Sequence, residues 1–209
     1  MKVKNIINMF SLPPLMSFEY EGDMDKIVEV ISNIDYHDSP GDGNIKSDER
    51  YILENPELSE LKEFCLECVS EYTKEIVCSS HEIDIQQSWV NYNKPEQQHP
   101  EHYHGNSMIS GVFYIMSDQE SGSPIMFKSD LHKNNFSVLL DLDLNRDRYN
   151  PYRSSEYPYP SIPGELILFS SMMTHYVPRN VSDEPRVSLS FNTYPKIPFG
   201  NENGLTQVK

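Results

Sequence analysis

The stretch His99-Pro100-Glu101-His102-Tyr103-His104-Gly105-Asn106 leads into a nearly continuous apolar run from Met108 to Ile115. Histidines two residues apart point the same way on an extended strand, because side chains alternate between its two faces. Gly105-Asn106 is typical of a turn, and the apolar run is typical of a strand buried on both faces. The stretch therefore predicts a hairpin whose first strand ends in a pair of metal-ligand side chains.

The composition limits the class of protein. A chain of 209 residues can bury one core, and its 15 prolines and 13 tyrosines favour a strand-rich, loop-rich domain. The formal net charge of −15 disfavours nucleic-acid binding. There is no secretion-type segment and no run of 18 apolar residues, so we expect a cytoplasmic protein that does not span a membrane. The three cysteines (Cys65, Cys68 and Cys78) are interpreted as reduced core residues rather than a redox or zinc pair.

The first 80 residues are predicted to be mainly helical. A short edge strand and a turn are expected within residues 1–22, and Asp23 is a candidate N-cap for a first helix. Residues 38–44 predict a loop. A second helix is indicated by Asn55 as its cap and Pro56 at its first position. We expect it to pack on the outside of a sheet.

From Ile83 onward the hydrophobic period changes to two, which indicates strands. The predicted strands cover residues 83–93, 108–116, 124–127, 165–169 and 186–192. One face of the first is predicted to carry Ile83, Ile85, Gln87, Trp89, Asn91 and Asn93. One face of the last is predicted to carry Arg186, Ser188, Ser190 and Asn192. Residues 129–160 form a long acidic, tyrosine-rich segment, for which a substrate lid and a plain insertion stand as equal alternatives.

Three histidines and one arginine make a coherent set if these strands form a barrel with their polar faces inside. Histidine is a usual ligand for Fe, Zn, Cu or Ni, and His102, His104 and His175 supply three. An inward-facing Arg186 needs an anionic partner, because an unpaired buried charge is very costly. A small anionic molecule bound by the guanidinium would provide that partner.

The joint order of these motifs resembles the Fe(II)/2-oxoglutarate-dependent oxygenases. The motifs are Pro100-Glu101-His102-Tyr103-His104 before a buried strand, Pro163-Gly164 before another, then His175, then Arg186-Val187-Ser188. The chain looks most like the prolyl-hydroxylase-like oxygenases of bacteria and phages. In that group a strand like Ser88-Trp89-Val90-Asn91 precedes the histidine pair, and a strand like that of residues 110–114 follows it. The resemblance covers most of the chain.

The resemblance implies a fold and an activity. The fold would be mainly β with flanking helices, a double-stranded β-helix (jelly roll) with N-terminal helices packed on the major sheet. Residues 1–209 would form one oxygenase-like domain, with a helical part at 1–80, a jelly-roll core at 83–195 and a tail at 196–209. The cofactors would be Fe(II) and 2-oxoglutarate. The enzyme would be a dioxygenase that hydroxylates a peptidyl or small-molecule substrate and releases succinate and CO2. The protein partner would be a second copy of the chain, in a homodimer.

The resemblance also implies roles for individual residues. The implied metal ligands, which are also the catalytic residues, are His102, His104 and His175. The implied 2-oxoglutarate-binding residues are Arg186, Ser188 and Tyr114 at the far carboxylate, with Asn91 as a further candidate.

One position departs from the family pattern, and it leaves alternatives open. The usual iron site has two histidines and a carboxylate, and His104 stands where that carboxylate is expected. A second register, His99-Pro100-Glu101, would supply a carboxylate. The alternative functions are a cupin-type three-histidine metalloprotein, which gives Arg186 no role, and a non-catalytic jelly-roll structural or binding protein. His37, His81 and His132 are interpreted as surface residues.

Overall fold

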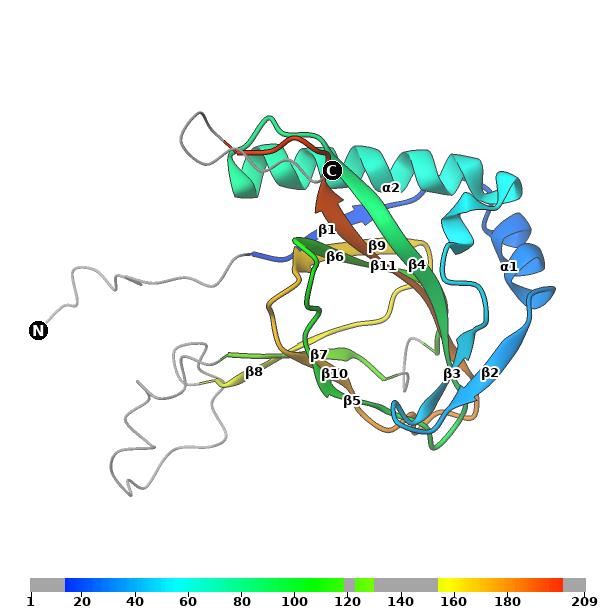
Figure 1. Ribbon diagram of the computed structural model, residues 1–209. Helices are drawn as coiled ribbons and strands as arrows, with labels where there is room; N and C mark the ends of the chain where they lie inside the picture. Colours follow the sequence, from blue (N-terminus) through cyan, green and yellow to red (C-terminus); the bar gives the residue numbers. More distant parts are fainter. Residues whose placement is uncertain (1–13, 119–122, 130–153, 201–209) are drawn as a thin grey trace, which may run out of the picture.

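The computed structural model describes residues 14–118, 123–129 and 154–200, and its strands form two antiparallel sheets (Figure 1). The major sheet has the order β1-β9-β6-β11-β4-β3-β2. Its strands are β1 (Met16–Glu19), β2 (Tyr36–Ser39), β3 (Asn44–Ser47), β4 (Ile83–Asn93), β6 (Ile109–Met116), β9 (Glu165–Ser170) and β11 (Arg186–Pro195). The minor sheet has the order β5-β10-β7-β8. Its strands are β5 (His99–His102), β7 (Ile125–Lys128), β8 (Glu156–Tyr159) and β10 (His175–Val177). The predicted mainly-β jelly roll is confirmed.

Helices cover the outer face of the major sheet, as predicted (Figure 1). They are α1 (Met24–Ser32), the 3-10 turns η1 (Ile52–Glu54) and η2 (Pro56–Leu58), α2 (Ser59–Tyr72), and its π-helical continuation η3 (Thr73–Val77). The Asp23 carboxylate accepts a hydrogen bond from the Lys26 amide at 3.0 Å, which satisfies one free amide of the first turn of α1. Asn55 accepts from the Glu57 amide at 3.0 Å, so it caps η2, one turn before α2 begins.

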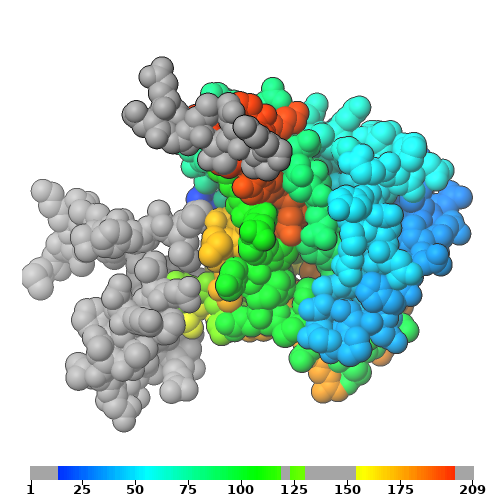
Figure 2. Space-filling view, viewed as in Figure 1, coloured from blue at the N-terminus to red at the C-terminus, as the bar shows by residue number. Residues whose placement is uncertain are grey.

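Two apolar layers hold the parts together. The larger lies between the helices and the major sheet, where Leu61, Cys65 and Val69 of α2 meet Val90 and Leu189 of the sheet. The smaller lies between the two sheets and is built from strands β6, β7 and β9. In the space-filling view the chain from α1 to α2 occupies one side of the molecule, beside the strands (Figure 2). Cys78 is exposed, so the prediction that all three cysteines lie in the core is wrong for this one.

A β-bulge in β4 changes the predicted face pattern of that strand. Gln87 pairs with Asn192 but Ile85 pairs with Thr193, so Gln86 is an extra residue in the ladder. One extra residue moves every side chain beyond it to the opposite face. Ile83 and Ile85 therefore pack in the helix-side core, whereas Trp89 and Asn91 face the interior between the sheets.

The predicted hairpin at the histidine stretch is wrong. Strand β5 pairs with β10 in the minor sheet, whereas β6 pairs with β9 and β11 in the major sheet. The turn at Gly105 and Asn106 therefore carries the chain from one sheet to the other, and Asn106 adopts a positive φ of 56° there. Strand β5 ends at His102, so His104 lies outside the ladder.

The loop predicted over residues 38–44 is confirmed at residues 40–43, which join β2 to β3. Its two ends belong to the hairpin, in which Ser39 pairs with Asn44. Two further segments differ from the sequence-based expectation. Strand β8 lies within the segment 129–160 and pairs with β7, and β10 was not predicted as a strand. Both strands are short and lie in the minor sheet, and three or four residues are too few to show a hydrophobic period.

Several predictions concern residues outside the described ranges. They are residues 1–13 of the stretch expected to hold a short edge strand and a turn, the central part of the segment 129–160 including His132, and most of the tail. His37 and His81 are exposed, as predicted. Within the described ranges, no helix has the length and apolar character needed to cross a membrane.

Candidate metal centre

Three histidines converge where strand β5 ends and strand β10 begins. His102 is the last residue of β5 and pairs directly with His175, the first residue of β10. His104 follows in the turn, where its backbone amide donates to the Ser171 carbonyl at 2.9 Å. One ligand nitrogen from each ring lies within 4.8 Å of those of the other two. The structure thus brings together the three histidines chosen from the sequence.

Hydrogen bonds fix the tautomer of each imidazole. Nδ1 of His102 lies 2.8 Å from the Pro100 carbonyl oxygen, and Nδ1 of His175 lies 2.8 Å from that of Met173. Nδ1 of His104 lies 2.6 Å from Oδ1 of Asn192. These oxygens can only accept, so each Nδ1 carries the proton and each Nε2 keeps a free lone pair. Metal-bound histidines usually show this pattern, and the donor set therefore fits a metal ion.

The protonation equilibria point the same way. Burial lowers the pKa of His104 to about 4 and that of His175 well below its usual value, and neighbouring imidazoles add to the effect. Burial also lowers the pKa of His102. A metal ion needs neutral imidazoles, and all three are neutral at pH 7.

A buried arginine lies deeper between the sheets. Arg186 is 2% exposed, and its Nε donates to the Ser123 carbonyl at 3.2 Å and to Ser161 Oγ at 3.0 Å. Its Nη1 donates to Ser188 Oγ at 3.2 Å, and the guanidinium carbon lies 5.2 Å from the centre of the Tyr114 ring. These partners are all neutral, and among the described residues no carboxylate pairs with Arg186. The charge is therefore left for an anionic ligand to neutralise.

The hydroxyl of Tyr114 adds an unpaired polar atom beside this arginine. It is buried and makes no hydrogen bond of normal geometry with any described residue. Burial raises the pKa of Tyr114 to about 12, although Arg186 acts in the opposite direction. Tyr114 pairs with Ser188 across the sheet, and Ser188 pairs with Asn91, so the three lie in one row on the interior face. A buried, unpaired donor next to a buried cation suits a carboxylate.

Asn91 is occupied within the protein. Its Oδ1 accepts from Trp89 Nε1 and from Asn44 Nδ2, both at 3.3 Å, and its Nδ2 donates to Ser190 Oγ at 2.9 Å. These bonds join β3, β4 and β11. A role for Asn91 in binding 2-oxoglutarate stays a prediction.

The alternative ligands, His99 and Glu101, do not form a metal-binding group with the other histidines. Glu101 is exposed and its carboxylate pairs with Lys128 Nζ at 2.5 Å. His99 stacks on His102 with ring centroids 4.3 Å apart, and its Nε2 lies 3.8 Å from an Asp42 carboxylate oxygen. Among the described residues, the histidines that could hold a metal ion together are His102, His104 and His175.

Sequence reasoning missed two contacts of His104. Trp89 stacks on its ring, with centroids 5.9 Å apart and planes 28° apart, and Asn192 binds its Nδ1. The sequence predicts that Asn192 shares the polar face of its strand with Arg186. That shared face is the sequence feature that points to Asn192 as a residue of the site.

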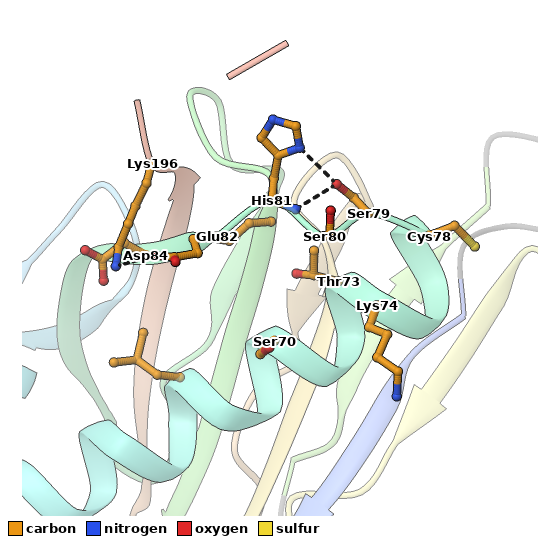
Figure 3. A pocket seen from close by; sticks show the side chains of 12 residues that line it. Ser70, Thr73, Lys74, Cys78, Ser79, Ser80, His81, Glu82, Asp84 and Lys196 are labelled. Carbon is orange, nitrogen blue, oxygen red and sulfur yellow. Dashed lines mark hydrogen bonds and ion pairs between the residues drawn. The ribbon is translucent and has the colours of Figure 1, made fainter. Parts of the chain in front are cut away.

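A hollow of about 680 Å³ lies elsewhere on the molecule, between the C-terminal end of α2 with η3 and residues 79–84 (Figure 3). Its lining mixes both charge signs, for example Lys74, Glu82 and Lys196. His81 in this lining bonds to Ser79 at 3.3 Å and has no second histidine beside it among the residues that line the hollow. It shares no residue with the three-histidine cluster, and we assign it no function.

The buried imidazoles predict acid sensitivity of the metal-free fold. Burial lowers the pKa of His99 to about 3 and of His104 to about 4, so the unfolded chain binds more protons as pH falls below about 6.5. The stability they contribute is therefore nearly complete at pH 7 and is lost as pH falls from about 6.5 towards 4 for His104 and towards 3 for His99. By pH 5 the loss should be about 2 kcal/mol for each of the two histidines, or about 4 kcal/mol together. Urea unfolding in EDTA at both pH values measures this loss. His99→Gln should flatten the dependence and the exposed-site variant His81→Gln should not; equal curves for all three proteins would contradict the expectation.

Several solved structures have a similar backbone, and two of those described below were solved with a metal ion and 2-oxoglutarate. HygX from Streptomyces hygroscopicus, solved with nickel, 2-oxoglutarate and hygromycin B, superposes with a TM-score of 0.59 at 10% identity over 88% of this chain and 83% of that one. A prolyl-4-hydroxylase from Pseudomonas putida gives 0.54 at 13% identity over 85% and 91%. The epimerase SnoN from nogalamycin biosynthesis, with Fe3+, alpha ketoglutarate and nogalamycin RO, gives 0.57 at 12% identity over 86% and 78%. At these identities the likeness shows the fold alone.

The sequence itself gives the family. No curated protein sequence matches the chain. Residues 87–192, just over half of the chain, match the family described as "Putative 2OG-Fe(II) oxygenase". The matched region runs from the bulge in β4 to Asn192, and it contains the three histidines, Tyr114, Arg186 and Ser188. The chain therefore belongs to the 2OG-Fe(II) oxygenase family, and its cofactors are Fe(II) and 2-oxoglutarate.

Proposed function

We propose that this oxygenase binds Fe(II) through His102, His104 and His175 and hydroxylates a small-molecule or peptidyl substrate. The observation that carries the proposal is the convergence of three neutral imidazoles, each with its Nδ1 proton bound to a carbonyl-type oxygen. Fe(II) with 2-oxoglutarate, when bound, supplies the oxidising power for the substrate by activating O2, and succinate and CO2 are released.

The protein's own residues would then orient 2-oxoglutarate and shield the site from water. Arg186, Ser188 and Tyr114 would hold the far carboxylate of 2-oxoglutarate, which gives the buried guanidinium its anionic partner and the Tyr114 hydroxyl an acceptor. The apolar layer that includes Phe127 and Phe169 excludes water from this side of the site. The three histidines stay neutral throughout, since each Nδ1 keeps its proton and donates it in a hydrogen bond to a fixed acceptor oxygen.

The substrate class rests on analogy of fold. HygX and SnoN were solved with the small molecules hygromycin B and nogalamycin RO, and another neighbour is a prolyl-4-hydroxylase. Folds of this kind host different reactions, so hydroxylation is proposed here by analogy with the prolyl-4-hydroxylase. We further propose one functional domain over residues 1–209 and a cytoplasmic setting; a homodimer stays a prediction.

Anaerobic loading tests this function. Purified protein is loaded with Fe(II) and 2-oxoglutarate, exposed to O2, and assayed for succinate. We expect succinate release that depends on iron and on 2-oxoglutarate, slow without substrate and faster with a true one. A matched sample loaded with Zn(II), which has no redox chemistry, should release none. Tight iron binding without succinate would favour the non-catalytic or cupin-type alternatives, and absence of both would refute the proposal.

A further inference from the structure

We propose that Asn192 is the positioning residue of the third metal ligand. It would hold the His104 ring in the one orientation and tautomer that turn Nε2 towards the metal. This inference rests on the proposed role of His104 as a ligand. It concerns the position at which the chain departs from the usual two-histidine, one-carboxylate site.

The need for such a residue follows from the position of His104 in the chain. His102 and His175 are held by each other across the β5–β10 ladder, where they form a residue pair. His104 lies two residues beyond the end of β5, in the turn that crosses between the sheets. Its backbone is tied by one bond to Ser171, which fixes the chain but not the rotation of the ring.

Asn192 supplies the missing constraint on the ring. Its Oδ1 lies 2.6 Å from His104 Nδ1, the shortest of the three bonds that the histidine Nδ1 atoms make here. The same oxygen accepts from Ser110 Oγ at 3.1 Å. Two donors on one oxygen fix which end of the amide faces the imidazole. Stacking on Trp89 covers one face of the ring and fixes its plane, but a ring flipped about its Cβ–Cγ bond would stack equally well. The bond to Asn192 selects one of these two orientations.

A chain of hydroxyl groups holds Asn192 itself in place. Ser110 Oγ lies 2.8 Å from Ser171 Oγ, which lies 2.7 Å from Ser107 Oγ. Ser107 in turn accepts from the Thr193 amide at 3.2 Å, next to Asn192 on β11. The network therefore links the strand that carries Asn192, the turn that carries His104 and the loop before His175. A rearrangement of any one of these segments would shift the ring of His104.

The amide also suits an imidazole ligand in its charge. An amide oxygen accepts the Nδ1 proton without adding negative charge, so His104 stays a neutral ligand. An aspartate at position 192 would retain the acceptor and make the imidazole a stronger donor to the metal. The structure thus predicts that the acceptor oxygen, and not the amide as such, is required.

Mn(II) titration followed by electron paramagnetic resonance tests the inference without turnover, because free Mn(II) gives a signal that is lost on binding. Asn192→Leu should weaken Mn(II) binding by roughly 10- to 100-fold, the usual loss for an outer-shell partner. Asn192→Asp should bind within a few-fold of the parent or tighter. Ser190→Ala, on the same face of β11 but bonded to Asn91, serves as the matched control and should bind like the parent. If Asn192→Leu does not fold, Asn192→Ser, whose hydroxyl is too short to reach His104, replaces it.

A second background separates positioning from a purely structural role. In His104→Ala, Asn192→Leu should cause no further loss of Mn(II) affinity, because the ring that it orients is absent. An equal loss in both backgrounds would overturn the inference, as would parental affinity of Asn192→Leu. The His104→Ala single variant tests the underlying function: if it binds Mn(II) as tightly as the parent, the three-histidine assignment fails and the Asn192 role fails with it. If His104→Ala loses affinity but Asn192→Leu does not, only the Asn192 role is wrong.

Discussion

Replacing His175 with alanine is expected to remove tight Fe(II) and Mn(II) binding and, with it, all 2-oxoglutarate-dependent succinate release. His175 is 4% exposed, and its ring lies 4.3 Å from that of His102 and 5.1 Å from that of His104. It is also the one of the three histidines that is fully buried, since His102 and His104 are partly exposed. Loss of a direct ligand should exceed the roughly 100-fold that loss of an outer partner costs. Anaerobic calorimetry with Mn(II) measures the affinity.

Two controls separate lost ligation from lost folding. His81→Ala removes an exposed histidine in the distant hollow and should leave Mn(II) affinity unchanged. His175→Phe fills the site with an apolar ring beside Phe169, whose centroid lies 5.0 Å away, and should fold without binding metal. Tight Mn(II) binding by folded His175→Ala would show that the metal site lies elsewhere.

Much of this centre was accessible from the sequence, for identifiable reasons. The spacing of His102, His104, His175 and Arg186, with the resemblance it supports, selected side chains that the fold then brings together. Period-two patterns placed the long strands β4 and β11 within a few residues, and a continuous apolar run did the same for β6. Such strands are buried on one or both faces over many residues, so their pattern is repeated often enough to be read.

The remaining features depend on long-range pairing that periodicity does not encode. The bulge at Gln86 inverts the first part of β4, and only the register with β11 reveals it. The turn after His104 looks like a hairpin turn, but β5 finds its partner in β10, more than seventy residues later in the chain. Asn192 reaches His104 across 88 positions of sequence, so its role could not be read from its neighbours. Local propensity leaves such pairings open, and tertiary packing decides them.

Replacing Arg186 with leucine should weaken 2-oxoglutarate binding far more than it disturbs the fold. Truncating one partner of a buried charge pair usually costs about 2–5 kcal/mol, which corresponds to a rise in Kd of roughly 30-fold to several thousand-fold. Mn(II) affinity without 2-oxoglutarate should stay at the parental value, since Arg186 contacts none of the three histidines by hydrogen bond. Calorimetry of 2-oxoglutarate into the Mn(II)-loaded variant gives the Kd.

Two further variants make the assignment of Arg186 specific. Arg186→Lys keeps the charge but loses the planar fork, so its Kd should lie between those of the parent and Arg186→Leu. Ser188→Ala removes one hydroxyl from the same carboxylate site and should raise the Kd for 2-oxoglutarate about tenfold or less.

In Arg186→Leu the Ser123 carbonyl and Ser161 hydroxyl lose a donor, so a decrease of about 1–3 kcal/mol in the free energy of unfolding is expected. If Arg186→Lys and Arg186→Leu both fold and bind 2-oxoglutarate like the parent, the arginine is a structural cation, and the carboxylate of 2-oxoglutarate must be held elsewhere.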